Sequence, residues 1–331
     1  MEIARFFNPT DGEILMRSRR HHPQKRNQPN PQGRPPLKSA LTIGTVDVPF
    51  NWIFVMIAGG AILFGAFAFV QKQRSAFAQD LADTVLRDLG AITSGASVAK
   101  GTSQVIDIPE STITLSCTDE CNCGLSIPPV TTGLKDNILY GQNIIKGTKI
   151  VMWSNDWNLP LRSTNLLYVT TPRIKHYILH RASPNDAFAK QFSERIPDNI
   201  NMTFLTDNTL SPGRITNIGY DAVRFVMLDD RTSGASPTCT VHSSFINADV
   251  SCVTIRPDTR TPGITNAYDI TIYDKAADRL GFSAKTYRVV GESMAIAAMF
   301  ADNSHQFECN LRQAYRRLAS VALLSASRSQ R

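Results

Sequence analysis

The residues best suited to chemistry are three aspartates that directly follow predicted strands. Asp207 comes after the apolar run 202–206, and Asp229 and Asp230 come after the run 223–228. In α/β sheets the ligand crevice lies at the carboxyl ends of the strands, and clustered carboxylates there can hold a divalent cation. Aspartates also commonly begin loops and cap helices. The sequence favours this second interpretation and identifies no catalytic residue, so the three aspartates are weak metal candidates.

The six cysteines are the next candidates for chemistry, and all lie beyond residue 116: Cys117, Cys121, Cys123, Cys239, Cys252 and Cys309. An even number predicts disulfides if this part of the chain is exported. The C-x3-C-x-C spacing of the first three matches no standard zinc site, and a metal centre and buried free thiols remain as alternatives. Of the fifteen possible pairings, the sequence supports one local pair, Cys239 with Cys252, across a predicted hairpin.

Three further patterns have a plain and a functional interpretation. Trp153 and Trp157 stand four residues apart and could bind a partner or a sugar, although packing in the core is the plainer interpretation. His176 and His180 fall in a strand-like run with no nearby carboxylate or cysteine, which favours structural histidines. The segment GESMA at 291–295 resembles a nucleophile elbow only in part, because the second glycine is missing.

These residues must be positioned relative to an uncharged segment of 21 residues, 50–70. An α-helix rises about 1.5 Å per residue, so the segment reaches about 30 Å, the thickness of a bilayer's hydrocarbon core. We therefore predict a transmembrane helix over 49–71. A cleaved signal peptide and a pilin-like leader are the alternatives. Lys72 and Arg74 separate the apolar run from the small residues at 76–78, and a long tail precedes it, which favours an uncleaved anchor.

The basic charge of the chain lies on one side of this segment. Seven basic residues and no acidic ones occur between positions 17 and 38: Arg17, Arg19, Arg20, Lys25, Arg26, Arg34 and Lys38. They equal the formal net charge of +7, so the rest of the chain sums to zero. The positive-inside rule then predicts a cytoplasmic N-terminus and an extracytoplasmic C-terminal domain in the cell membrane. Residues 1–48 read as a disordered tail beside the lipid bilayer rather than as a folded nucleic-acid-binding face.

An amphipathic stalk is predicted after the membrane segment. Phe77, Leu81, Val85 and Leu89 recur every four residues within the stalk and linker, 72–100. Their apolar stripe must pack on the chain's own domain or on a partner, either another envelope protein or a second copy. Phe77, Leu81 and Val85 are therefore candidate partner-binding residues, together with the two tryptophans.

Residues 101–324 are predicted to form an extracytoplasmic α/β domain with a mixed sheet. The succession of strand, helix, strand and strand over 166–228 indicates some parallel pairing. A break near 232–238 could divide the region into two subdomains, and the tail 325–331 is expected to fray. Strands are predicted at 104–108, 112–116, 166–170, 175–179, 202–206, 223–228, 241–245, 250–255, 270–273 and 286–290, and helices from 183, at 293–300 and around 311–322.

Four segments carry a resemblance to a known group: VPFNWIFVMIAGGAILF, VIDIPESTITLSC, KGTKIVMWSNDWNLPLRSTNLLYVTTPRIKHYI and HQFECNLRQAYRRL. In order and spacing, over most of residues 48–320, they resemble uncharacterised single-pass membrane proteins of small-genome (DPANN-type) archaea. The resemblance implies an archaeal envelope protein and supplies no activity, cofactor or catalytic residue. The long His- and Pro-rich tail departs from that group's pattern.

The expected function is that of a membrane-anchored structural or binding component of a cell-envelope assembly, without a cofactor and without catalysis. The alternative is an anchored extracytoplasmic hydrolase or metal-dependent enzyme that uses Asp207, Asp229 and Asp230.

Overall fold

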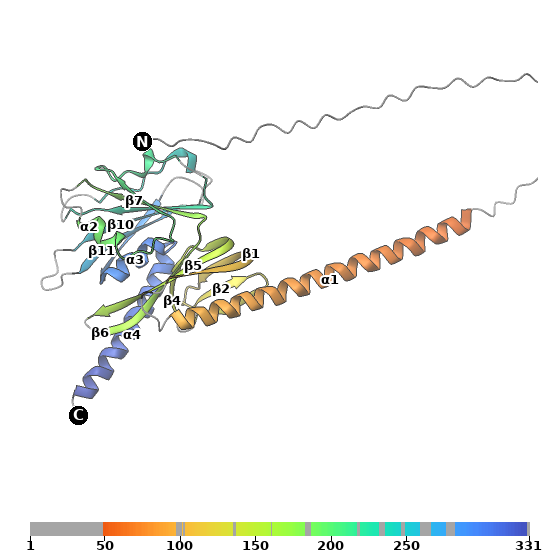
Figure 1. Cartoon of the computed structure of the whole chain (residues 1–331), viewed down its shortest axis with the longest axis horizontal. Helices are drawn as coiled ribbons and strands as arrows, with labels where there is room; N and C mark the ends of the chain where they lie inside the picture. The colour runs from red at the N-terminus through yellow and green to blue at the C-terminus, as the bar shows by residue number, and fades with distance from the viewer. Residues whose placement is uncertain are drawn as a thin grey trace, which may run out of the picture. The chain divides into compact units, whose positions relative to one another are not determined.

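The computed structural model describes residues 49–96, 101, 103–134, 137–159, 161–182, 187–216, 219–231, 236–245, 249–258, 266–275 and 282–329 of the 331-residue chain (Figure 1). The predicted basic tail, the linker residues 97–100 and residues 330–331 lie outside these ranges. The chain separates into two compact units, 1–62 and 63–331. Within the first unit the structure describes only the start of helix α1. All other described elements belong to the second unit.

Helix α1 extends from Pro49 to Ala96, so the predicted membrane segment and stalk form one helix of 48 residues. It contains one segment that is long and apolar enough to cross a membrane. The large apolar side chains between Trp52 and Val70 are all exposed. The apolar and amphipathic parts therefore follow each other without a helix break.

The C-terminal part of α1 packs on the domain of the same chain. Ala82, Val85, Leu86 and Leu89 are buried in a cluster with apolar side chains of the adjacent sheet. Phe77, one turn earlier, is 71% exposed. The predicted apolar stripe is thus confirmed as a domain contact only from Ala82 onward.

The sheet beneath α1 has six strands in the order β3-β2-β1-β5-β6-β4. Its strands are β1 (Ser103–Cys117), β2 (Cys123–Ile127), β3 (Val130–Gly133), β4 (Ile138–Gly141), β5 (Ile144–Leu159) and β6 (Leu161–Thr170). All neighbours are antiparallel except β4 and β6, which are parallel. One face of this sheet packs on α1 and the other packs on the main core.

The second sheet also has six strands, in the order β12-β11-β10-β9-β7-β8. Its strands are β7 (Ile174–His180), β8 (Met202–Thr206), β9 (Ala222–Leu228), β10 (Asp249–Pro257), β11 (Ala267–Lys275) and β12 (Phe282–Val290). Strands β8, β7, β9 and β10 are mutually parallel, and β10, β11 and β12 are antiparallel. The prediction of a mixed α/β architecture with parallel pairing is confirmed.

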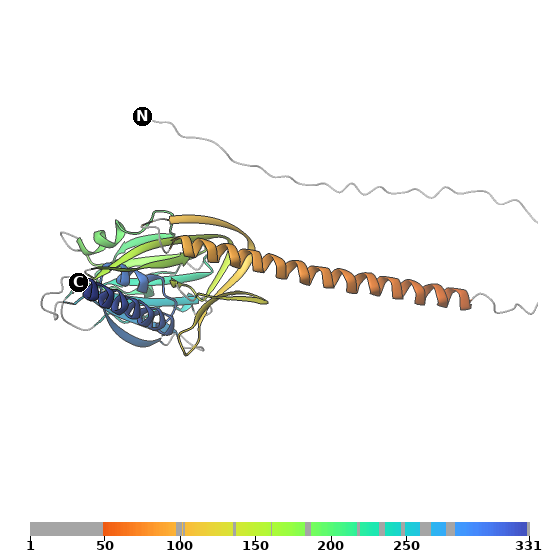
Figure 2. The same ribbon diagram turned by 90° about the horizontal axis from the view of Figure 1, so that it is seen from below.

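Helix α3 (Glu292–Phe300) lies between the two sheets and is buried along its whole length (Figure 1). Side chains of both sheets pack on it, together with α2 (Ala187–Ser193). Helix α4 (Ser304–Ser329), dark blue in Figure 2, packs on β4 and β6 through its first half. Its last residues are mostly exposed. The far face of the second sheet is covered by connections that include the short 3-10 helices η1 (Pro212–Arg214) and η2 (Ser243–Phe245).

Both sheets share the core around α3, so the possible subdomain break near 232–238 does not divide the domain. That region connects β9 to β10, and these two strands pair in register along the whole of β9. A boundary there would separate hydrogen-bonded neighbours.

Two local predictions differ from the structure, and four strands were not predicted. The apolar residues at 241–245 form a loop and η2 rather than a strand, because they cover the sheet instead of joining it. Helix α4 continues to Ser329 instead of fraying from 325. The strands β2, β3, β4 and β5 were not anticipated. Much of β5 is buried on both faces and therefore lacks the period-two alternation that marks a half-exposed strand.

Candidate functional site

The candidate site lies where the parallel strands of the second sheet end. After β7 the chain forms β8 on one side of β7 and then returns to form β9 on the other side. This reversal makes the carboxyl ends of β7 and β9 a topological switch point, the place where open α/β sheets bind their ligands. Arg181 follows β7 directly and Asp229 follows β9 directly.

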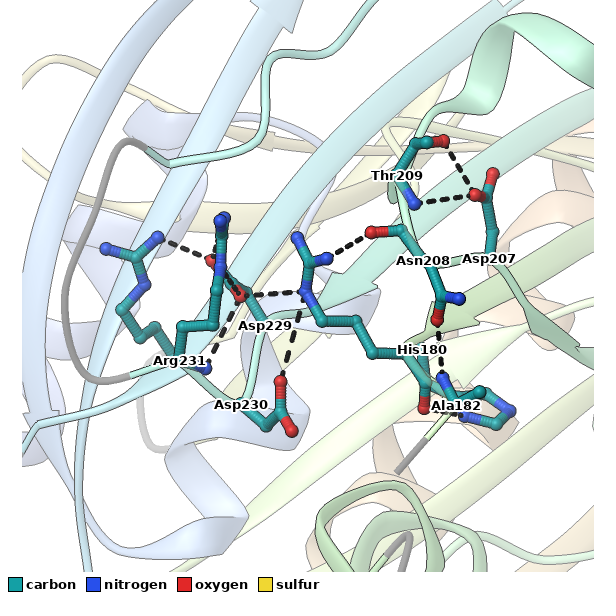
Figure 3. Close-up of polar contacts among 10 residues, drawn as sticks. His180, Ala182, Asp207, Asn208, Thr209, Asp229, Asp230 and Arg231 are labelled. Atoms are coloured by element: carbon teal, nitrogen blue, oxygen red, sulfur yellow. Dashed lines mark hydrogen bonds and ion pairs between the residues drawn. The ribbon is translucent and has the colours of Figure 1, made fainter. Parts of the chain in front are cut away.

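Asp229 is the centre of this edge, and three arginines surround it (Figure 3). Its carboxylate is fully buried and accepts a hydrogen bond of 2.9 Å from Arg231 Nε, another from Arg256 Nη2, and a longer contact of 3.4 Å from Arg181 Nε. Burial by itself raises the pKa of Asp229, but the hydrogen bonds and charges of Arg231 and Arg256 outweigh burial and lower it to about 2. Asp229 is therefore ionised throughout the physiological pH range.

The other two predicted aspartates lie at the same edge but do not converge with Asp229. Asp207 turns back on its own loop, accepting hydrogen bonds from Thr209 N at 2.8 Å and Thr209 Oγ1 at 2.6 Å. Asp230 is partly exposed, and its carboxylate lies 3.9 Å from Arg181 Nε. Within the described residues no three His, Cys, Asp or Glu side chains gather as metal ligands. Three guanidinium groups on one carboxylate instead make this edge unsuitable for a cation.

The charge balance at the edge favours an anion. Three guanidinium groups face the two carboxylates of Asp229 and Asp230, and Arg231 is 42% exposed at its side chain. The planar guanidinium fork matches carboxylate and phosphate groups, which accept two parallel hydrogen bonds from it. The arrangement can therefore hold the strand ends together and also present positive charge to an anionic partner.

A backbone-centred link joins the ends of β7 and β8 beside this cluster. Ala182 N donates a hydrogen bond of 2.9 Å to the side chain of Asn208, and Arg181 Nη1 donates to the backbone oxygen of Asn208 (Figure 3). The sequence pattern pointed to the carboxylates and not to the arginines. Each arginine lies in a strand of the parallel region or within three residues of a strand end, and this position was the available signal.

Both strand histidines are buried in β7 and occupy structural positions. Burial and the charge of Arg224 lower the pKa of His176 to about 3, so its imidazole is neutral. The Nδ1 atom of His180 lies 3.2 Å from the backbone oxygen of Arg181. These positions agree with the structural interpretation of the two residues.

The two tryptophans are in the core and offer no exposed ring to a sugar or partner. The rings of Trp153 and Tyr168 are tilted against each other with centroids 4.6 Å apart, and Trp157 Nε1 donates a hydrogen bond of 2.8 Å to Val290 O. Four-residue spacing places both indoles on the same face of β5. The sequence did not identify β5 as a strand, so this common inward direction was missed.

The elbow-like segment does form a strand–turn–helix junction, between β12 and α3. Gly291 there has φ +94°, in the region that favours glycine. Ser293, however, is buried, and its hydroxyl donates a hydrogen bond of 2.7 Å to Asp156 O. The serine is engaged in holding α3 against β5 rather than being presented as a nucleophile.

All six cysteines are paired: Cys117 with Cys123, Cys121 with Cys309, and Cys239 with Cys252. The predicted local pair Cys239–Cys252 is confirmed, although it joins a loop to β10 instead of closing a hairpin. The metal and free-thiol alternatives for the cysteines are excluded by this pairing.

No family model, curated protein or solved structure matches this chain. A functional proposal therefore depends on the residues and geometry described above.

Proposed function

We propose that this protein is a single-pass membrane protein that presents its α/β domain outside the cell as a structural or binding component of an envelope assembly. One observation carries the proposal: α1 combines an apolar segment with exposed side chains and, further along the same helix, a segment buried on the domain. A contiguous apolar surface of this size is unfavourable in water and is satisfied by lipid. The domain is then attached to its anchor by packing as well as by the chain.

The orientation of the anchor follows from charge and cysteine chemistry. The seven basic residues before the membrane segment favour a cytoplasmic N-terminus. Three disulfides in the domain support an oxidising, extracytoplasmic environment. Both arguments lead to the same topology although they use different parts of the chain.

The binding part of the proposal depends on the part of the α1 surface that the domain does not cover. Phe77 is 71% exposed, and Leu81 is also exposed, whereas Val85 is buried against the domain. Phe77 and Leu81 lie on one face of the helix because they are four residues apart. We propose that this short stripe contacts a membrane protein partner or a second copy, and that Val85 is not part of the contact.

Labelling of intact cells tests the topology. A membrane-impermeant reductant followed by a membrane-impermeant maleimide is expected to label the native cysteines, while a cysteine introduced by Ser39→Cys stays unlabelled until the cells are lysed. Labelling of the tail cysteine alone in intact cells would overturn the orientation.

Crosslinking in native membranes tests the contact at the stalk. Phe77→Asp with Leu81→Asp is expected to abolish a crosslinked species, while the domain keeps its thermal unfolding temperature because neither side chain is part of the buried cluster. Ser75→Asp with Gln79→Asp adds the same charge to another face of the helix and serves as the matched control. Equal crosslinking in both double variants would contradict the proposed contact.

A further inference from the structure

The disulfide between Cys121 and Cys309 has two sulfur atoms in different surroundings. Cys121 lies on the turn between β1 and β2, is half-buried, and has φ +64°, an uncommon backbone conformation for a residue other than glycine. Cys309 lies on α4 and is buried. Cys121 is therefore the more exposed residue of the pair and the side from which a thiol in solvent would approach, while Cys309 is on the protected side.

A histidine contacts the protected sulfur. His305 precedes Cys309 by one turn of α4, and its Nε2 lies 3.9 Å from Cys309 Sγ and 3.2 Å from the backbone oxygen of Thr118. The carbonyl oxygen can only accept a hydrogen bond, so Nε2 carries a hydrogen. The same N–H is within reach of the sulfur. A disulfide sulfur is a weak acceptor, whereas a thiolate accepts a much stronger, charge-assisted hydrogen bond.

The other two disulfides lack this combination. Cys239 and Cys252 are both buried. Cys117 and Cys123 are half-buried and face each other in register across the β1–β2 hairpin. In the part of the chain that the structure describes, Cys309 is the one disulfide sulfur in contact with a side-chain N–H donor.

We infer that Cys121–Cys309 is a thiol–disulfide exchange site, with Cys121 as the attacked sulfur and Cys309 as the leaving thiolate that His305 stabilises. The co-reactant is a thiol, and a dithiol completes the reaction. The inference depends on side chains of the folded domain and does not require the proposed membrane topology.

The exchange is balanced in two displacements. The first thiolate of the dithiol attacks Cys121 Sγ, the Cys121–Cys309 bond breaks, and its electron pair remains on Cys309 as a thiolate beside His305. The second thiolate of the dithiol then attacks the dithiol's first sulfur in the mixed disulfide and releases Cys121 as a thiolate. The protein disulfide has gained two electrons, and the dithiol has become a disulfide.

Exchange would release the β1–β2 turn from α4. His305 also holds this turn through Thr118 O, so two links between the turn and the helix meet at one histidine. The Cys117–Cys123 bridge keeps the hairpin itself closed. The reduced protein would therefore differ at this contact while both sheets stay intact.

Graded reduction of the full-length protein in detergent tests the order of the bridges. Dithiothreitol is added for increasing times, free thiols are alkylated, and each cysteine is quantified by mass spectrometry. Cys121 and Cys309 are expected to become labelled together and before the other four. Earlier labelling of either other pair would overturn the inference.

Variants of His305 test its role in stabilising the thiolate. His305→Ala is expected to slow reduction of Cys121–Cys309 about tenfold, the effect of losing one hydrogen bond to a charged group. His305→Gln keeps an N–H donor and should recover part of the rate, while Arg316→Ala on the same helix should not change it. An unchanged rate in His305→Ala would contradict the role of the histidine.

A pH readout separates this role from simple loosening of the turn. In the Cys121→Ser variant the Cys309 thiol is free, and its alkylation rate against pH reports its ionisation. Removal of His305 is expected to shift that profile to higher pH, which a purely structural effect would not do. The other charged groups of the turn and of this part of α4 are the same in all these variants: Asp119, Glu120, Glu308 and Arg312. An unshifted profile would exclude the proposed stabilisation of the thiolate.

Discussion

Arg224 Nη2 donates a hydrogen bond of 3.0 Å to Asp302 Oδ1, and this ion pair joins β9 to the junction between α3 and α4 inside the domain. Arg224 is almost completely buried, and its Nε has no hydrogen-bond partner among the residues that the structure describes. A buried charge of this kind persists only when its partner is present. The pair therefore links the helix layer to the second sheet.

Replacement of Arg224 by Met is expected to destabilise the domain by about 3–5 kcal/mol, because the Asp302 side chain, only 13% exposed, then lacks its charged partner. Burial raises the pKa of Asp302, and Arg224 opposes that effect. Without Arg224, protonation of Asp302 relieves the buried charge, so the loss should become smaller as the pH falls. Urea unfolding of both proteins at pH 7 and pH 5 measures the difference in their unfolding free energies. A loss below about 1 kcal/mol at pH 7 would show that the ion pair is not required.

The Asp229 cluster predicts an acid-dependent contribution to stability. The folded-state pKa of about 2 lies below the ordinary value of 3.8. The contribution, about 2 kcal/mol, is therefore present above pH 4 and is lost as the pH falls from 4 to 2. Asp229→Asn removes it, and the difference in unfolding free energy between the two proteins should narrow over that range. A difference that does not depend on pH would contradict the assignment.

Gly291→Ala is expected to destabilise the domain by about 1–3 kcal/mol. A Cβ at this position would lie 2.9 Å from Trp157 Nε1, and the residue has φ +94°. Gly133→Ala is the matched control, since its Cβ would meet nothing within 4 Å and its backbone is not in the left-handed region. Thermal unfolding measures the unfolding temperatures of the two variants, and that of Gly291→Ala is expected to be lower. Equal unfolding temperatures would show that the β12–α3 junction can relax.

The three disulfides should contribute unequally to stability. The Cys121–Cys309 disulfide closes a loop with a sequence separation of 188, and its removal is expected to lower the free energy of unfolding by about 5 kcal/mol. Removal of Cys239–Cys252, with a separation of 13, is expected to lower it by about 3 kcal/mol. Double Cys→Ala variants of each pair, unfolded in guanidinium chloride, provide the comparison. A larger loss for the short loop would mean that native-state packing outweighs chain entropy.

Much of the domain's secondary structure was predictable, because buried segments leave short apolar runs and half-exposed segments leave a periodic pattern. The strands β7 to β12, apart from their exact ends, and the helix α3 were found as short apolar or alternating runs, and the stripe of α1 was found by its periodicity. Strand β5 was not predictable, because it is buried on both faces around Trp153 and its buried run includes the polar residues Ser154 and Asn155, which leaves neither an alternation nor a continuous apolar run. The register of the sheets also depends on strands far apart in the sequence.

The sequence placed the candidate aspartates at one edge of the sheet but did not anticipate the arginines around Asp229. The rule that ligands lie at carboxyl ends of parallel strands brought Asp207 and Asp229 to the same edge. It could not show that three arginines would converge on Asp229, because Arg181, Arg231 and Arg256 come from three separate strand ends.

The sequence by itself determined the features that depend on composition along a short stretch. These are the single apolar segment and the basic excess before it; the sequence also favoured the local pair Cys239–Cys252 without excluding other pairings. Only the tertiary structure decided that Val85 packs on the domain while Phe77 does not, and that Cys121 pairs with Cys309 beside His305. The physical reason is that a local pattern reports how a segment meets water or lipid, whereas contacts between distant segments depend on how the whole chain packs.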